Sequence, residues 1–117
     1  MSTKSIPILL VGCACLALPA LADDKPSLDE GKKLYRVYCA SCHGKAGKGD
    51  GPGAGALKTP PYNLTWSSAK DDYLRQIIAK GGAAMERSPE MPPWAGAITP
   101  AQIDSVIIYI KTLRAAQ

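Results

Sequence analysis

The chain has two cysteines and a histidine close together, in the string Cys39-Ala40-Ser41-Cys42-His43. Two thiols three positions apart can reach the two vinyl groups along one edge of a porphyrin. The neighbouring imidazole is then held under the ring, where it can bind iron. Because C-x-x-C-H is the attachment signature of c-type haem, the sequence predicts one covalent haem c on Cys39 and Cys42, with His43 as an iron ligand. His43 is the only histidine of the chain, so a second imidazole is not available as the other axial ligand.

A C-x-x-C pair also occurs in other kinds of site. A redox-active dithiol opens a helix within a βαβ unit, whereas this pair follows a predicted helix in a chain without strand signals. A structural zinc site needs four ligands, and the chain beyond residue 22 offers two cysteines and one histidine. A structural disulfide between Cys39 and Cys42 stays open as an alternative.

A methionine from a loop is the expected second axial ligand of the iron. Met91 stands in the string Met91-Pro92-Pro93-Trp94, and prolines restrict the backbone of the loop that would present it. Met85 is the second candidate, and either side chain could instead fill a gap in the core. We take Met91 and His43 as the metal ligands. A thioether favours ferrous iron and leaves no open position for peroxide or substrate, so this pair indicates electron transfer rather than an enzyme or a haem sensor.

These residues must be positioned by helices, because helical periodicity is the regular pattern that the sequence shows. It predicts three helices, over residues 28–38, 69–80 and 100–114. Local cap signals accompany them: a Ser27/Glu30 capping box, Ser68 as a cap with Gly81 as a stop, and a Thr99/Gln102 box with proline at the first helical position.

Two long loops separate the predicted helices. Residues 44–67 and 82–93 are rich in glycine and proline and have no periodicity. Loops of this length in a compact domain are usually functional or disordered. The sequence therefore predicts an all-α domain of about three helices, with long loops wrapped around one covalent haem.

The first 22 residues are typical of a secretory signal peptide. Lys4 precedes an apolar run over 6–20, and Ala20-Leu21-Ala22 has small residues where a signal peptidase cuts. The run is shorter than the roughly 20 apolar residues that a membrane span needs. We expect residues 1–22 to be removed and 23–117 to form a periplasmic domain. The string before Cys13 resembles a lipobox, which makes lipid anchoring at Cys13 a minority alternative.

Composition limits the classes of partner. The 117-residue chain has a formal net charge of +4 and contains no phenylalanine. Its basic residues are not clustered as a nucleic-acid-binding stripe requires, so no nucleic-acid partner is expected. A core without phenylalanine is thin for a domain of this size, and a buried macrocycle would complete it.

The chain resembles the class I cytochromes c over Ser27–Leu113. The attachment motif ends a first helix, a looped middle follows, a Met-Pro string precedes the last helix, and the run Gly47-Lys48-Gly49-Asp50-Gly51-Pro52 is familiar from bacterial monohaem members. The resemblance implies the cytochrome c fold and again Met91 as the ligand. It also implies that Gly31 and Tyr35 meet Tyr109 where the terminal helices cross.

The implied function is one-electron transfer between a donor and an acceptor redox protein, without catalysis or a small-molecule substrate. The chain could instead be a fixed haem subunit of a membrane redox complex, and the sequence does not separate these two functions. A sensor or peroxidase would require an open sixth position on the iron.

Several further residues are candidates for supporting roles. We expect a carbonyl of Pro52, Pro60 or Pro61 to accept a hydrogen bond from His43 and fix its tautomer. Tyr62, Asn63 and Trp66 are candidate contacts of the haem propionates, with loop packing as an equal alternative. Trp94 is expected to pack against the haem. Four scattered lysines could steer an acidic partner, although such residues usually form only a solvated surface: Lys45, Lys48, Lys58 and Lys80.

Overall fold

The computed structural model describes residues 1–2, 7–8, 12 and 24–114. Apart from residues 1–2, 7–8 and 12, the predicted signal peptide lies outside these residues, as does Cys13, so both processing alternatives stay predictions. In chain order the elements are α1 (Leu28–Tyr38), α2 (Ala40–His43), the 3₁₀ turns η1 (Ala54–Ala56) and η2 (Leu64–Trp66), α3 (Asp71–Lys80), the 3₁₀ turn η3 (Ala83–Met85) and α4 (Pro100–Arg114). The described part of the chain contains no strand, which confirms the all-α class.

α1 begins where its predicted cap places it. The Ser27 hydroxyl accepts a hydrogen bond from the Glu30 amide at 3.3 Å, and Asp29 and Glu30 stand in the first turn, where carboxylates favour the helix dipole. The second half of the capping box is replaced by a tertiary contact, because the Ser27 amide donates to the Ser105 hydroxyl on α4 at 3.0 Å.

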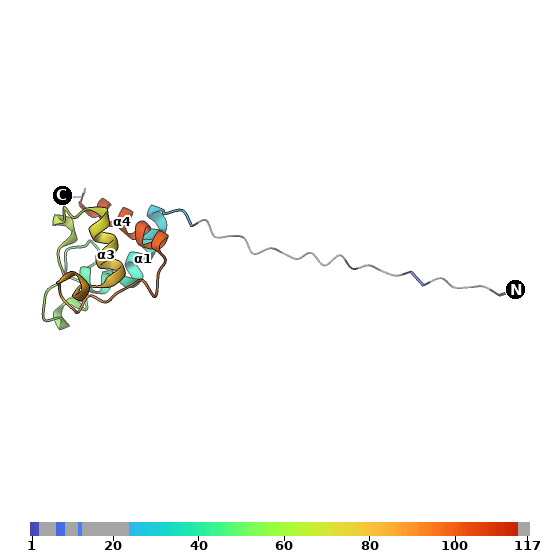
Figure 1. The fold of residues 1–117 in the computed structure, drawn as a ribbon, viewed down its shortest axis with the longest axis horizontal. Helices are drawn as coiled ribbons and strands as arrows, with labels where there is room; N and C mark the ends of the chain where they lie inside the picture. Colours follow the sequence, from blue (N-terminus) through green and yellow to red (C-terminus); the bar gives the residue numbers. More distant parts are fainter. Residues whose placement is uncertain (3–6, 9–11, 13–23, 115–117) are drawn as a thin grey trace.

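α1 crosses α4 at a glycine, and the two helices lie side by side in Figure 1. A Cβ on Gly31 would overlap the Ser105 carbonyl, so the crossing distance depends on glycine. One turn further, the rings of Tyr35 and Tyr109 meet edge to face, with centroids 5.0 Å apart. The predicted crossing of the terminal helices at Gly31 and Tyr35, with Tyr109 as the aromatic partner, is confirmed.

α3 begins later than predicted. Its N-cap is Lys70 rather than Ser68, and the preceding Ser67 hydroxyl accepts from the Ala69 amide at 3.3 Å, which holds that segment in a turn. The predicted stop is confirmed, because Gly81 ends the helix with φ +81°.

The core lies where α1 and α3 pack against α4. α4 contributes four of the nine buried apolar side chains, more than any other element, because its apolar residues recur at helical spacing on the covered face. The buried apolar side chains are Tyr35, Leu64, Leu74, Ile78, Ile98, Ile103, Val106, Ile107 and Ile110. Within the described part of the chain, no helix is both long and apolar enough to cross a membrane.

Candidate functional site

The three residues of the predicted attachment motif lie at the junction of α1 and a short helix, α2, which the sequence did not reveal as a separate element: Cys39 caps both helices, and Cys42 and His43 lie on α2. Cys39 ends α1, its amide bonding to the Tyr35 carbonyl at 2.9 Å, and its own carbonyl then accepts from the amides of Cys42 at 3.2 Å and His43 at 2.9 Å. Positions i, i+3 and i+4 share a helix face, so the turn brings both thiols and the imidazole together. Both cysteines are half-buried and free, with no disulfide between them. Burial raises the pKa of the Cys39 thiol to about 12.

A glycine-rich segment, residues 49–53, lies along this turn and donates hydrogen bonds to its last three carbonyls. The amides of Gly49, Gly51 and Gly53 donate to the carbonyls of His43, Cys42 and Ser41 at 2.7, 3.1 and 2.7 Å. A Cβ on Gly51 would overlap the backbone of α2. Such close backbone approach needs glycine, which explains the alternation of glycine in residues 49–53.

The imidazole of His43 is oriented by a backbone carbonyl. Its Nδ1 lies 3.1 Å from the Tyr62 carbonyl oxygen. A carbonyl can only accept, so Nδ1 carries the proton and Nε2 keeps a lone pair for a metal. Burial lowers the pKa of His43, and the hydrogen bond to Tyr62 acts in the opposite direction.

The expectation that Pro52, Pro60 or Pro61 supplies this acceptor is therefore wrong. Pro61 instead lies against Gly49, where a Cβ would overlap the Pro61 carbonyl oxygen. The next carbonyl along the chain, that of Tyr62, is the one that faces the imidazole.

Gly44, the residue after His43, is held by a hydrogen bond from a side chain of α1. The Tyr35 hydroxyl donates to the Gly44 carbonyl at 2.7 Å, and the Tyr35 side chain is fully buried. Burial is also the main cause that raises the pKa of Tyr35 above its ordinary value, so the hydroxyl remains a donor at neutral pH.

Met91 comes from a different part of the chain, the loop between η3 and α4. Its carbonyl accepts from the Gly82 amide at 2.9 Å, and its amide donates to the Ser88 carbonyl at 3.3 Å. A Cβ on Gly81 would lie 2.8 Å from the Pro93 nitrogen and 2.9 Å from the Met91 oxygen, so glycine at this helix end lets the loop fold back. The Met91 side chain packs partly buried against the core.

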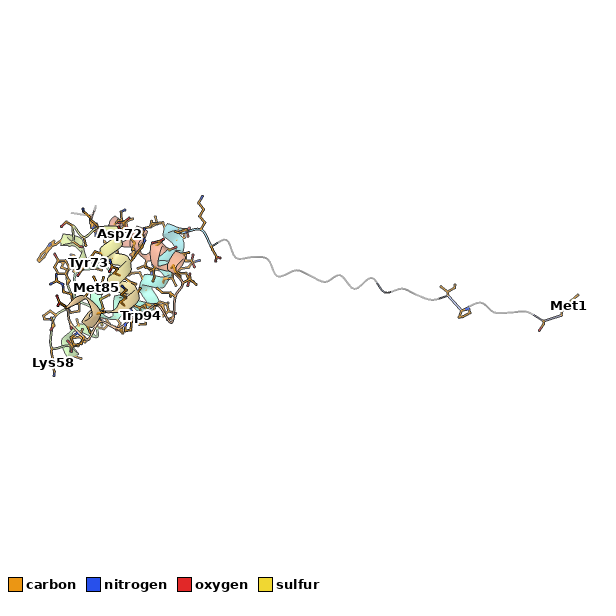
Figure 2. The ribbon with its side chains drawn as sticks, in the orientation of Figure 1. Met1, Lys58, Asp72, Tyr73, Met85 and Trp94 are labelled. Carbon is orange, nitrogen blue, oxygen red and sulfur yellow. The ribbon has the colours of Figure 1, made fainter. Side chains whose placement is uncertain are left out.

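Met85 lies on η3 and is half-buried, but it is not among the side chains packed against the core. Figure 2 labels both Met85 and Trp94, which lie in the helical body.

The ring of Trp94 packs against Tyr38, the residue before Cys39, with ring centroids 5.0 Å apart. The loop of Met91 is thus in contact with the end of α1 that leads into the attachment turn.

The other predicted supporting residues have varied environments. Tyr62 and Trp66 are 59% and 70% exposed, which is unusual for large aromatic side chains. Asn63 uses its Oδ1 to cap η2, accepting from the amide and the hydroxyl of Thr65 at 3.0 and 2.6 Å. The four candidate steering lysines, Lys45, Lys48, Lys58 and Lys80, are all exposed.

One functional candidate was missed by the sequence reasoning. The carboxylate of Glu90, next to Met91, accepts from the amides of Lys58 and Thr59 at 2.9 and 3.0 Å. These two bonds hold the pKa of Glu90 below its ordinary value. No local signal could have found the contact, because its partners are backbone groups 31 and 32 residues away.

The donor set fits a covalent haem. Such a cofactor uses groups of the kind found here: the free thiols, the oriented imidazole and exposed aromatic residues such as Tyr62 and Trp66. Among the described residues, no group of three or more His, Cys, Asp or Glu side chains is placed to hold a metal ion by itself.

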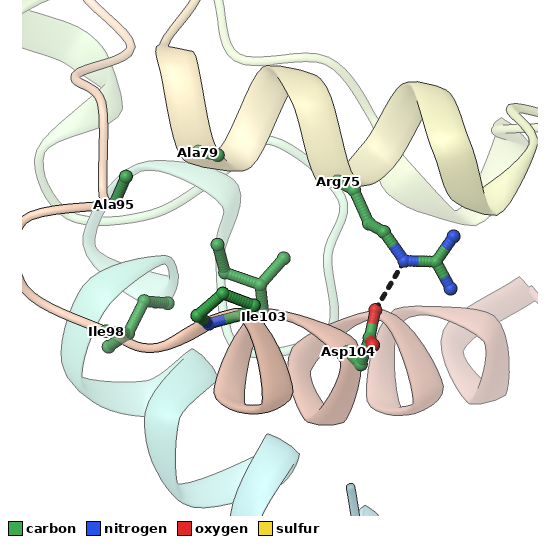
Figure 3. Close-up of a pocket in the computed structure, with 7 residues that line it drawn as sticks. Arg75, Ala79, Ala95, Ile98, Ile103 and Asp104 are labelled. Atoms are coloured by element: carbon green, nitrogen blue, oxygen red, sulfur yellow. Dashed lines mark hydrogen bonds and ion pairs between the residues drawn. The ribbon is translucent and has the colours of Figure 1, made fainter.

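A separate small pocket lies between α3 and the start of α4, shown in Figure 3. Its volume is about 200 Å³ and its walls are mainly apolar, with the Arg75 guanidinium bonded to Asp104 at 2.6 Å. None of the predicted site residues lines this pocket.

Comparisons with known proteins identify the family of the chain. Residues 26–110 match the family model described as cytochrome C oxidase, cbb3-type, subunit III. The chain is 29% identical over 102 residues to the cbb3-type cytochrome c oxidase subunit FixP of Azorhizobium caulinodans, covering 84% of this chain and 31% of FixP. It is 33% identical over 93 residues to the quinohemoprotein alcohol dehydrogenase ADH-IIG of Pseudomonas putida, covering 79% of this chain and 11% of that enzyme. The chain thus spans about a third or less of the length of these relatives.

Solved structures give the same fold. A chain of the Kuenenia stuttgartiensis reducing HAO-like protein complex matches with a TM-score of 0.62 and 29% identity, over 77% of this chain and 43% of that one. A solved c-type cytochrome matches with a TM-score of 0.53 and 23% identity, over 73% of this chain and 94% of that one. The second likeness supports the fold alone.

Proposed function

This chain belongs to the family of the cbb3-type cytochrome c oxidase subunit III, and so to the class I c-type cytochromes, and from that we propose that it is a periplasmic electron carrier with one haem. Covalent haem c and haem-based electron transfer follow from the family. The finer proposal has four parts: a single haem, attachment at Cys39 and Cys42, axial ligation by His43 and Met91, and export by residues 1–22.

The observation that carries the proposal is the turn of residues 39–43, on which two free thiols accompany an imidazole whose Nδ1 lies 3.1 Å from the Tyr62 carbonyl oxygen. The thiols of Cys39 and Cys42 would hold the haem by adding their S–H groups across its two vinyl groups, an addition that needs no oxidant. When bound, haem supplies an iron that changes between ferric and ferrous states and so carries one electron. The bond from His43 to Tyr62 keeps Nε2 unprotonated for that iron and fixes the ring orientation.

Met91 is the proposed second ligand because its loop is held at both sides. Gly82 anchors its carbonyl, and Trp94 three residues later packs on Tyr38 beside the attachment turn. Together, the Met91 thioether and the His43 imidazole would leave no open position on the iron, which suits outer-sphere electron transfer and not bond-making chemistry. We therefore propose that the chain itself is not an enzyme.

A second candidate function is a haem subunit fixed in a membrane redox complex. The names of the relatives favour it, because the FixP proteins are oxidase subunits. In both functions the same residues pass one electron at a time. The difference lies in whether the native protein purifies alone from the soluble fraction, as a free carrier would, or with partner chains from the membrane fraction.

The ligand assignment is tested by replacing each loop methionine in the haem-loaded protein. Met91→Ala should remove the weak sulfur-to-iron charge-transfer band of the oxidised protein and let carbon monoxide bind the reduced protein, while Cys39 and Cys42 keep the haem attached. Met85→Ala is the matched control and should leave the band intact. If the band disappears only with Met85→Ala, the assignment is wrong. If neither change affects it, the closed-iron argument for pure electron transfer fails.

A further inference from the structure

Glu90 connects two segments that are far apart in the sequence. Its Oε1 accepts from the Lys58 amide at 2.9 Å and its Oε2 from the Thr59 amide at 3.0 Å. Because each carboxylate oxygen takes one of two consecutive amides, the pair of bonds fixes the orientation of the segments as well as their distance. Lys58 lies at the lower left edge of the helical body in Figure 2.

The Glu90 carboxylate is also held by a neighbouring residue of its own loop, Ser88. The Ser88 hydroxyl accepts from the Glu90 amide at 3.2 Å and lies 3.4 Å from Oε2, to which it donates. Ser88 in turn accepts the Met91 amide through its carbonyl at 3.3 Å. The residues on either side of Pro89 therefore form one small bonded unit that includes the backbone of Met91.

The segment that Glu90 contacts follows the glycine-rich segment that packs on the attachment turn. The Gly53 amide donates to the Ser41 carbonyl at 2.7 Å, Ala54 to Gly51 at 2.9 Å, and Leu57 to Ala54 at 3.1 Å. Lys58 and Thr59 follow at once. Glu90 thus joins the loop of the proposed ligand Met91 to the chain that packs on the turn of the other proposed ligand, His43.

We propose that Glu90 is a positioning residue, which holds the Met91 loop closed and thereby limits release of the thioether from the iron. This inference rests on the proposed function, because it takes Met91 as the ligand. Glu90 is accessible to water, where hydrogen bonds and charges contribute less than in the interior. We therefore expect loss of the Glu90 contact to weaken the hold on Met91 only severalfold, whereas removing Met91 abolishes the thioether ligand altogether.

The test is imidazole binding to the oxidised, haem-loaded protein, because imidazole can bind the iron only when Met91 has left. Glu90→Gln keeps the size of the side chain but presents an NH₂ group to one of the two amide donors. It should raise the apparent imidazole affinity about three- to tenfold, the range for losing one modest hydrogen bond. Glu86→Gln is the control, because it removes the same charge from the same loop at an exposed residue, and it should change the affinity less than about twofold.

A second variant separates reach from charge. Glu90→Asp keeps the negative charge but is one methylene too short to hold both amides. If the carboxylate positions the loop, Glu90→Asp should resemble Glu90→Gln. If Glu90→Asp behaves like the unaltered protein, the effect is one of charge alone and the positioning role is wrong.

Hydrogen exchange of the Lys58 and Thr59 amides gives a readout that does not depend on the axial ligand. Both amides should lose protection in Glu90→Gln and keep it in Glu86→Gln. Lost protection with unchanged imidazole affinity would overturn the proposal, since the contact would then exist without controlling Met91.

Met91→Ala distinguishes failure of this inference from failure of the proposed function. If Met91→Ala strongly raises imidazole affinity and Glu90→Gln does not, Met91 is the ligand and the inference about Glu90 is wrong. If Met91→Ala also leaves the affinity unchanged, Met91 is not the ligand and both proposals fall.

Discussion

Replacing Tyr35 with phenylalanine tests how the fold supports the residue next to the proposed iron ligand. The change removes one hydroxyl that donates to the Gly44 carbonyl at 2.7 Å. Phenylalanine keeps the ring, so the edge-to-face contact with Tyr109 at 5.0 Å should remain. The perturbation is therefore close to the loss of a single buried hydrogen bond.

Its magnitude follows from what the Gly44 carbonyl keeps. That oxygen also accepts from the Gly47 amide at 3.1 Å, so it does not become wholly unsatisfied. A fully orphaned buried acceptor costs about 1–3 kcal/mol, whereas an ordinary buried hydrogen bond contributes about 1 kcal/mol. We expect Tyr35→Phe to lower the free energy of unfolding by about 1–2 kcal/mol.

Guanidinium denaturation of the oxidised, haem-loaded protein measures this change. Tyr109→Phe is the matched control: it removes a hydroxyl from the other ring of the pair, for which the structure shows no hydrogen bond among the described residues. It should lower the free energy of unfolding by less than about 0.5 kcal/mol. Equal effects of the two substitutions, or no measurable effect of Tyr35→Phe, would refute the assigned role of the Tyr35 hydroxyl.

Other changes test the packing around the site. Gly31→Ala places a Cβ into the backbone of α4 and should lower the free energy of unfolding by about 2–3 kcal/mol in denaturant titration; a neutral result would contradict the close crossing. Ile107→Ala should lower the free energy of unfolding by about 2–5 kcal/mol because Ile107 is 2% exposed, and Ile108→Ala at the next position, which is 38% exposed, should lower it clearly less. Gly81→Ala should displace the Met91 loop, because φ is +81° and the new Cβ meets backbone atoms of that loop. Carbon monoxide should then bind the reduced variant more readily than the unaltered protein. Unchanged binding would mean that the loop moves without releasing its ligand.

The parts of the fold set by local chemistry were predictable from the sequence. The bounds of α1, the Thr99/Gln102 box with bonds of 2.9 and 3.2 Å, and the stop at Gly81 all depend on residues within a few positions of one another. The start of α3 was misplaced because Ser68 is a good cap residue, whereas the turn formed by Ser67 delays the helix and the N-cap is Lys70, whose side chain makes no cap bond.

Long-range backbone contacts could not be predicted in the same way. Every residue has a carbonyl, so the choice of Tyr62 over the neighbouring prolines depends on how the chain passes Gly49 and not on the side chain at that position. The contact of Glu90 with two amides has the same origin. The motif predicted which residues would do chemistry, whereas the groups that orient them became visible only in the fold. The assignment of Met91 stays a prediction.

The central claim is the covalent attachment of one haem at Cys39 and Cys42, and intact-mass spectrometry tests it most directly. The full chain should be expressed with residues 1–22 in a host that matures c-type cytochromes, and the product isolated from the periplasm. The account predicts the mass of residues 23–117 plus one haem, with no thiol free to react with an alkylating reagent. The mass of the bare polypeptide, with both thiols alkylated, would contradict it.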